Sequence, residues 1–387
     1  MDRYCLRDFE KVSDGTLIGA TSPDESCDKF ELLLTDSRLL TDPENTAFFA
    51  INGTNHNGSD FMETLYQRGV RNFVIPRDSS PPDVSLTRSF PEAIFLKVKD
   101  PVSALQQFSR KKRESYDIPV VGITGSNGKT IVKEWLYQLL HRDLEICRSP
   151  KSYNSQIGVP LSVWQLDPDS DLGIFEAGIS RPGEMKSHQP VIQPTVGIFT
   201  NISDAHQENF NTYRQKINEK LNLFTETEQI LYCRDKQEIR LLLEDDPRFS
   251  KKQLISWSTE IPATLRINQI HRQNGHTDIS ASFLDRPVKI RIPFSDEASI
   301  ENSIHCLLYL LHSGYGSKAV LERFEQLTPI AMRLELKEGK RNCLIINDSY
   351  NSDLMSLTIA LDFLSNQKKH TQKTVILSDI QQSTVQA

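Results

Sequence analysis

Four short and largely apolar runs recur in the middle of the chain, each followed by residues with helical spacing. They lie at 118–124, 172–175, 196–199 and 229–232. A continuous apolar run, without polar alternation, is typical of a strand that is buried on both faces, as in a parallel sheet. Because such runs alternate here with helical patterns, we predict a doubly wound α/β domain.

The region before these runs has a different pattern. Short apolar strands are predicted at 47–51 and 72–75, with a helical stretch at 60–68 between them. A helix is predicted from Val102 to Arg113, and it ends in a basic, polar run. We interpret residues 1–115 as a separate small α/β domain.

The region after the four runs changes to alternating residues between 264 and 293. The Asn274-Gly275 pair within it is a signal for a hairpin turn. Two helices are predicted next, at 297–313 and 317–326. We expect this segment to complete the central domain, which would then extend from 116 to 328.

A third pattern begins after Pro329. Strands are predicted at 333–337, 343–347 and 374–377, with a helix at about 354–364. Since few residues remain before Ala387, we expect 329–387 to be an incomplete domain from a longer protein.

Composition and length favour a folded protein of more than one domain. A length of 387 residues exceeds what one core normally organises, and 38% hydrophobic with 25% charged residues is ordinary for a folded chain. The strongest apolar run, 306–311, is too short to span a bilayer, and the six cysteines form no Cys-x-x-Cys pair. We therefore expect a cytoplasmic protein with reduced thiols and no membrane partner. A formal net charge of −6 favours small-molecule partners over nucleic acid.

A glycine-rich segment follows the first central strand and precedes a helical pattern. Backbone N–H groups of such a turn, together with a helix N-terminus, bind phosphates, a lysine neutralises them, and a hydroxyl binds magnesium. Lys129 and Thr130 would have these two roles, although Ile123 replaces the first glycine of the common pattern. The alternative is a purely structural glycine turn. We call the segment 125–130 the P-loop; its residues are Gly125, Ser126, Asn127, Gly128, Lys129 and Thr130.

Three polar residues follow the next strands. Glu176 and His206 come after strand ends, and Lys220 lies on the helix beyond. Ligands bind outside the carboxyl ends of parallel strands, so these groups could share one site with Lys129. Taken singly, each is more often a capping or surface residue.

Lys220 stands inside an apolar helical stripe formed by Tyr213, Ile217, Leu221 and Phe224. Burial disfavours an ammonium ion, and a neutral amine can add carbon dioxide to become a carbamate, which is a metal ligand. The alternative is a lysine whose stem is buried while its charge reaches water.

The order and spacing of these motifs resemble the central domain of the Mur ligases. The matching segments are the P-loop, Phe175-Glu176-Ala177-Gly178, the Thr200-to-His206 segment and a lysine fourteen residues later. In the N-terminal part, Thr35-Asp36-Ser37-Arg38 resembles the uridine-nucleotide-binding domain of the two late-acting members. The expected fold is thus the three-domain Mur ligase architecture, with a Rossmann-like third domain.

Two further segments resemble the D-alanyl-D-alanine-adding type. They are Lys151 to Pro160, which includes Asn154 and Gln156, and Asp348-Ser349-Tyr350-Asn351. The Asp-Asn-Pro-Arg signature of the type that adds the third amino acid is not seen. The family usually has an aspartate where Asn347 stands, a glycine where Ser203 stands, and a proline shortly after Asn351.

The resemblance implies an ATP-dependent ligase that joins D-alanyl-D-alanine to UDP-N-acetylmuramoyl-tripeptide through an acyl phosphate, with two magnesium ions. The P-loop would hold ATP, aided by Asn302, Arg333 and Asp348. Ser37 and Arg38, with Asn154 and Gln156, would bind the uridine-linked substrate. The implied metal ligands are Thr130, Glu176, His206 and carbamylated Lys220, and the implied catalytic residues are Lys129, His206 and Lys220.

Two other interpretations remain open. The chain could be another ligase of the superfamily, either the third-amino-acid-adding or the folylpolyglutamate type. It could also be a truncated, inactive module that binds nucleotide sugars. In some bacteria the D-alanyl-D-alanine-adding ligase precedes a fused alanine racemase, so such a parent protein is also considered.

Overall fold

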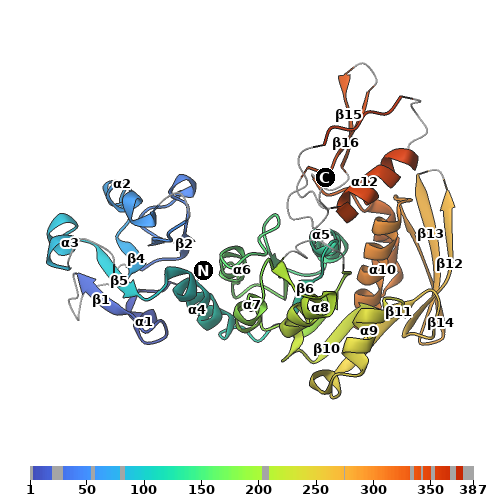
Figure 1. The fold of residues 1–387 in the computed structure, drawn as a ribbon, viewed down its shortest axis with the longest axis horizontal. Helices are drawn as coiled ribbons and strands as arrows, with labels where there is room; N and C mark the ends of the chain where they lie inside the picture. Colours follow the sequence, from blue (N-terminus) through green and yellow to red (C-terminus); the bar gives the residue numbers. More distant parts are fainter. Residues whose placement is uncertain are drawn as a thin grey trace. The chain divides into compact units, whose positions relative to one another are not determined.

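The computed structural model describes residues 3–19, 29–53, 57–78, 83–202, 209–273, 275–331, 335–340, 343–349, 354–366 and 372–377. The chain forms two compact units (Figure 1). The first comprises Met1–Asp117, Gln156–Ser170 and Pro190–Ile192, and the second comprises Ile118–Ser155, Asp171–Gln189 and Gln193–Ala387. The domain boundaries predicted at 115/116 and 328/329 stay predictions.

The first unit is built on a five-stranded sheet with the order β1-β5-β4-β3-β2. All neighbouring strands are parallel except β1, which is antiparallel to β5. The bounds are β1 (Thr16–Gly19), β2 (Leu32–Leu34), β3 (Thr46–Phe49), β4 (Asn72–Pro76) and β5 (Ile94–Val98), with helices α1 (Arg7–Glu10), α2 (Met62–Gln67), α3 (Asp83–Ser89), α4 (Pro101–Arg113) and α6 (Gly158–Val163). The strands predicted at 47–51 and 72–75 are confirmed as β3 and β4.

Helix α4 shows how the sequence sets one of these elements. Asp100 is its N-cap and accepts hydrogen bonds from the amides of Val102 and Ser103, while Pro101 takes the first helical position, where no amide donor is needed. Its apolar stripe, which includes Leu105 and Phe108, belongs to the core on one face of the sheet.

The second unit is built on a nine-stranded sheet with the order β14-β13-β12-β11-β10-β9-β6-β8-β7. Strands β7 to β12 pair in parallel, and β13 and β14 extend the sheet in antiparallel fashion. The bounds are β6 (Val120–Thr124), β7 (Ile146–Arg148), β8 (Leu172–Glu176), β9 (Val196–Phe199), β10 (Gln229–Cys233), β11 (Gln253–Ser258), β12 (Leu265–Gln273), β13 (His276–Phe283) and β14 (Arg286–Ile292). The four predicted strands and the hairpin are confirmed, although Asn274 lies outside the described residues.

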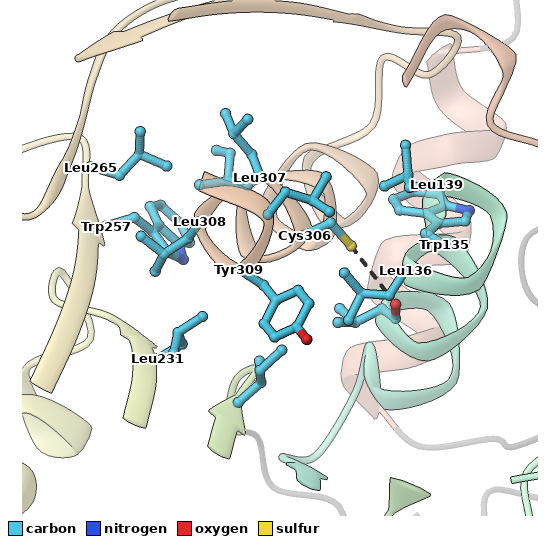
Figure 2. Close-up of a cluster of buried hydrophobic side chains, with 14 of the residues drawn as sticks. Trp135, Leu136, Leu139, Leu231, Trp257, Leu265, Cys306, Leu307, Leu308 and Tyr309 are labelled. Carbon is cyan, nitrogen blue, oxygen red and sulfur yellow. Dashed lines mark hydrogen bonds between the residues drawn. The ribbon is translucent and has the colours of Figure 1, made fainter. Parts of the chain in front are cut away.

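The core of this unit explains why its strands read as continuous apolar runs. Val121 and Ile123 of β6 join the core that includes α5 (Lys129–Leu140) and α10 (Glu297–His312). Gly122, between them, lies against Pro194 and Leu223 instead, so both faces of β6 are covered. Figure 2 shows α10 between α5 and the sheet. The Cys306 thiol donates to the Val132 carbonyl oxygen at 3.8 Å.

The structure describes five further α-helices. They are α7 (Met185–Ile192), α8 (Tyr213–Leu221), α9 (Gln237–Glu244), α11 (Lys318–Glu322) and α12 (Leu354–Asn366). Among the described helices, none combines the length and apolar character that crossing a membrane requires.

The C-terminal residues form a two-stranded antiparallel sheet of β15 (Glu335–Glu338) and β16 (Leu344–Asn347). The strand predicted at 374–377 is wrong, because these residues form no strand. Val375, Ile376 and Leu377 are 51%, 97% and 52% exposed. An apolar run forms a strand only where a neighbouring strand pairs with it, and the described residues supply none here. The predicted α/β fold class is nevertheless confirmed.

Candidate functional site

The P-loop joins β6 to α5, and two of its glycines are required by its shape. Gly125 has φ of +147° and Gly128 has φ of +84°, both in the region that side chains disfavour. A β-carbon at Gly125 would overlap the Thr200 hydroxyl, and one at Gly128 would overlap the Asn302 side-chain amide. The loop therefore packs tightly against the end of β9 and against α10.

Residues directly after β9 fix the shape of this loop. The Ser126 amide donates to the Asn201 carbonyl oxygen at 2.9 Å, and the Asn127 amide donates to Asn201 Oδ1 at 2.9 Å. Thr200 Oγ1 donates to the Asn127 carbonyl oxygen at 2.6 Å. Three hydrogen bonds thus hold the loop before any ligand contacts it.

The N-terminus of α5 gives the loop its positive end. Gly128 is the N-cap and brings no side-chain cap, so the helix dipole and the first amides favour an anion there. Lys129 Nζ lies over the loop and donates to the carbonyl oxygens of Gly125 and Ser126, each at 2.8 Å. An ammonium at a helix N-terminus is suited to holding phosphates.

Glu176 ends β8 and meets the first turn of α5. Its side chain is fully buried, and Thr130 Oγ1 donates to Oε2 at 3.0 Å. Thr130 Oγ1 also lies 3.0 Å from the Ser152 hydroxyl. A carboxylate and hydroxyls gathered beside a phosphate-binding helix end are hard oxygen ligands of the kind that magnesium prefers.

Lys133 is a residue of this site that the sequence analysis missed. Its side chain is fully buried and its Nζ lies 3.2 Å from Glu176 Oε1. It stands one turn after Lys129, among the buried residues Val132, Trp135 and Leu136 of α5. That stripe is the same kind of signal that drew attention to Lys220.

Lys220 lies buried on α8, as its apolar stripe predicts. Its Nζ donates to the Gly125 carbonyl oxygen at 3.0 Å, the same oxygen that Lys129 contacts. Burial first, and then the nearby charges of Lys129 and Lys216, lower the pKa of Lys220 well below its ordinary value. The side chain of Lys220 can therefore lose a proton and become a neutral amine at the P-loop.

Several other predicted site residues can be placed only in part. His206 and Arg333 lie outside the described residues. Asn302 is buried on α10 beside Gly128, and Asp348 directly follows β16. Within the described ranges, no three or more histidine, cysteine, aspartate or glutamate side chains form a group that could hold a metal ion. The proposed second metal site therefore stays a prediction.

The residues predicted to bind the uridine-linked substrate fall in both units. Asn154, in the second unit, has Nδ2 3.4 Å from Glu176 Oε2, so it lies beside the pair formed by Thr130 and Glu176. In the first unit, Gln156 Oε1 accepts from Gln106 Nε2 at 2.9 Å. Ser37 and Arg38 lie in a short 3₁₀ helix (Ser37–Leu39), where Asp36 raises the pKa of the exposed Arg38 guanidinium.

A buried histidine supports the P-loop from behind. His305 on α10 has Nε2 3.0 Å from the Thr200 carbonyl oxygen, and its Nδ1 accepts from Trp257 Nε1 at 3.3 Å. This pairing requires a neutral ring with the proton on Nε2. Burial lowers the pKa of His305 to about 4.

The low pKa of His305 predicts a loss of stability in mild acid. An unfolded histidine titrates near 6.5, so between pH 6.5 and about 4 the unfolded chain binds more protons and stability falls as pH falls. The contribution is on the order of 3 kcal/mol at pH 4. Urea unfolding at several pH values should show a shallower decline for His305→Gln than for the unchanged chain. Equal pH slopes would contradict the buried neutral ring.

Comparison with known proteins agrees with this geometry. The family model for the Mur ligase middle domain matches residues 123–310. The UDP-N-acetylmuramoyl-tripeptide--D-alanyl-D-alanine ligase of Borreliella burgdorferi is 25% identical over 351 residues, which cover 90% of this chain and 74% of that protein.

Solved structures share the fold. The structure of MurF from Acinetobacter baumannii has a TM-score of 0.81 at 21% identity and covers 95% of this chain and 77% of that one. The MurF ligase of Thermotoga maritima, solved in complex with ADP, has a TM-score of 0.73 at 20% identity and covers 86% and 74%. The chain therefore contains a Mur ligase middle domain, and its similarity to D-alanyl-D-alanine-adding ligases extends along most of its length.

Proposed function

We propose that this chain is an ATP-dependent ligase that joins D-alanyl-D-alanine to UDP-N-acetylmuramoyl-tripeptide during synthesis of the peptidoglycan precursor. The observation that carries the proposal is the meeting of Thr130 and Glu176 at the N-terminus of α5, beside Lys129. The similarity to the Borreliella burgdorferi ligase across 90% of the chain supports the choice of substrates.

The residues at this edge of the sheet fit a magnesium ion. Glu176 is a buried carboxylate with the Thr130 hydroxyl at 3.0 Å, and both side chains supply oxygen atoms. When bound, magnesium neutralises and orients the phosphate oxygens of ATP. We assign Thr130 and Glu176 to one ion, and His206 with Lys220 to a second.

The chain's own residues would act mainly by positioning. The α5 N-terminus and Lys129 hold the phosphates while a carboxylate oxygen of the tripeptide attacks the γ-phosphorus and ADP leaves. The amine of the dipeptide then attacks the acyl carbon of the acyl phosphate, and inorganic phosphate leaves as the amine gives up a proton. The first step brings two anionic groups together, and the second develops negative charge on the acyl oxygen and the leaving phosphate, so fixed positive groups at the P-loop lower both barriers.

Lys220 would serve this site as a carbamate. Its lowered pKa supplies a neutral amine, which adds carbon dioxide to form an N–C bond and releases one proton. The product is an anionic oxygen ligand in place of a neutral amine. This change would also place a negative charge close to the Lys129 ammonium.

Substrate binding and location complete the proposal. Ser37, Arg38, Asn154 and Gln156 are assigned to the uridine-linked substrate, and Asn302, Arg333 and Asp348 to ATP. An exposed guanidinium such as that of Arg38 suits a diphosphate, because it can donate two parallel hydrogen bonds. We place the reaction in the cytoplasm, where ATP and nucleotide-linked precursors occur. A fused alanine racemase in a longer parent protein stays a hypothesis.

The proposal predicts a defined product. The full chain, incubated with ATP, Mg²⁺, the uridine-linked tripeptide and D-alanyl-D-alanine, should release phosphate and form the pentapeptide, measured by mass spectrometry. Leaving out either the tripeptide or the dipeptide should stop both signals. Product formed with a single amino acid on the uridine-linked dipeptide, or on a folate, would favour the other ligase types instead.

The binding-module alternative makes a different prediction. Such a chain would bind uridine nucleotide and ATP in separate calorimetric titrations and yet release no phosphate with all substrates present. That combination of results would contradict the ligase assignment for this chain.

A further inference from the structure

The ammonium group of Lys133 is surrounded by oxygen atoms that a helical position alone does not bring together. Its Nζ lies 2.6 Å from the Ser149 carbonyl oxygen, also contacts that of Lys151, and lies 3.2 Å from Glu176 Oε1. Glu134 Oε1 is a fourth neighbour at 3.1 Å. An ammonium ion has only three protons, so this fully buried group is surrounded by more acceptors than it can satisfy at once.

The position of Lys133 on α5 brings it to the proposed metal carboxylate. Residues three apart lie on the same helix face, and Thr130 and Lys133 both contact Glu176. Thr130 Oγ1 lies 3.0 Å from Oε2 and 3.3 Å from Oε1, whereas Lys133 Nζ contacts Oε1, so their shortest contacts are with different oxygen atoms. The two side chains therefore fix the plane of the carboxylate.

The same ammonium holds the turn that follows β7. Lys151, in this turn, has φ of +50°, which a non-glycine residue adopts only when surrounding contacts hold it there. Two residues that follow Lys151 contact the site: Ser152 contacts Thr130, and Asn154 lies 3.4 Å from Glu176 Oε2. Lys133 thus connects the metal carboxylate with the segment assigned to the uridine-linked substrate.

We propose that Lys133 is a positioning residue for metal binding, which holds Oε1 of Glu176 and the turn at 149–151 so that Oε2 and the Thr130 hydroxyl face one divalent cation. This inference rests on the proposed function. Groups that orient a metal ligand in this way typically change metal affinity by about 10- to 100-fold when they are removed.

The direction in which metal affinity changes when Lys133 is replaced distinguishes a positioning residue from one that only forms a buried ion pair. Removing a positive charge beside a cation site would, by charge alone, tighten cation binding. Loss of the carboxylate's orientation would weaken it. Weaker binding after removal of Lys133 therefore reports positioning.

The test measures metal binding directly. Mn²⁺ is titrated into the full chain with saturating ADP, and free Mn²⁺ is followed by electron paramagnetic resonance. Lys133→Met is expected to raise the dissociation constant of Mn²⁺ about 10- to 100-fold. A constant that is unchanged within twofold, or lower, would overturn the inference. Should Lys133→Met fail to fold in thermal unfolding, Lys133→Gln, whose amide can still donate to the turn, replaces it with the same expected direction.

Two control variants sharpen the result. Glu134→Gln removes the other carboxylate near Lys133 and leaves Glu176 paired, so its Mn²⁺ constant should stay within twofold. Lys112→Met removes a buried lysine of the first unit, which lies 4.9 Å from the Trp164 ring centroid, and should change stability alone. A loss in either control as large as that in Lys133→Met would contradict the specific role.

The outcome also separates this inference from the function on which it rests. An unchanged chain that does not bind Mn²⁺ with ADP would contradict the proposed nucleotide site itself. Binding by the unchanged chain, with equal binding by Lys133→Met, would contradict the inference alone.

Discussion

Replacing Lys129 with alanine is expected to lower kcat for ATP-dependent ligation by about 100- to 1,000-fold or more. Lys129 Nζ lies over the P-loop carbonyl oxygens at 2.8 Å, where it can neutralise the outer phosphates as charge accumulates on them. Phosphate release, measured with all substrates present, gives the rate.

Stability should be almost unaffected by the same change. The Lys129 ammonium contacts the carbonyl oxygens of Gly125 and Ser126, and the loop itself is held by Thr200 and Asn201. Lys318→Ala, which removes a lysine that is 92% exposed on α11, serves as the control with full activity. Undiminished phosphate release from Lys129→Ala would exclude the P-loop assignment.

Replacing Lys220 with alanine is the second change with a large expected effect. Loss of a carbamate ligand should lower kcat by about 100-fold or more, because a bound cation loses an anionic partner. Small carboxylates such as acetate or formate can enter the space left by the side chain and supply an oxygen anion. Activity should therefore recover in part with added carboxylate, measured as a dose-dependent rise in phosphate release.

Lys129→Ala provides the matched control for this rescue. The lost group there is a cation, so carboxylates should give no recovery. Full activity of Lys220→Ala in bicarbonate-free buffer without added carboxylate would contradict the carbamate. Recovery of both variants to the same degree would also contradict it, because the effect would then be unspecific.

The sequence predicted those features that depend on local pattern. Continuous apolar runs located β6, β8, β9 and β10, because strands covered on both faces need no polar positions. The Asn274-Gly275 pair located the turn between β12 and β13. The P-loop was recognisable because strand, glycines and helix follow one another directly in the chain.

Features that depend on packing between distant segments were harder to predict. Lys133 has the same apolar surroundings in sequence as Lys220, yet only the fold brings β7 and β8 to its ammonium group. The role of His305 likewise depends on its hydrogen bonds with Thr200 and Trp257, which are distant in the chain. The strand predicted at 374–377 is wrong for the opposite reason: the residues have a suitable pattern, but the described residues provide no strand to pair with them.

We propose that the P-loop and the oxygen ligands of a magnesium ion meet at one edge of the parallel sheet. A crystal structure of the full chain with Mg²⁺ and a non-hydrolysable ATP analogue tests this most directly. We predict the phosphates against residues 125–130 and an ion at about 2.1 Å from oxygens of Thr130 and Glu176. Phosphates bound elsewhere, or an ion that contacts neither side chain, would contradict the claim.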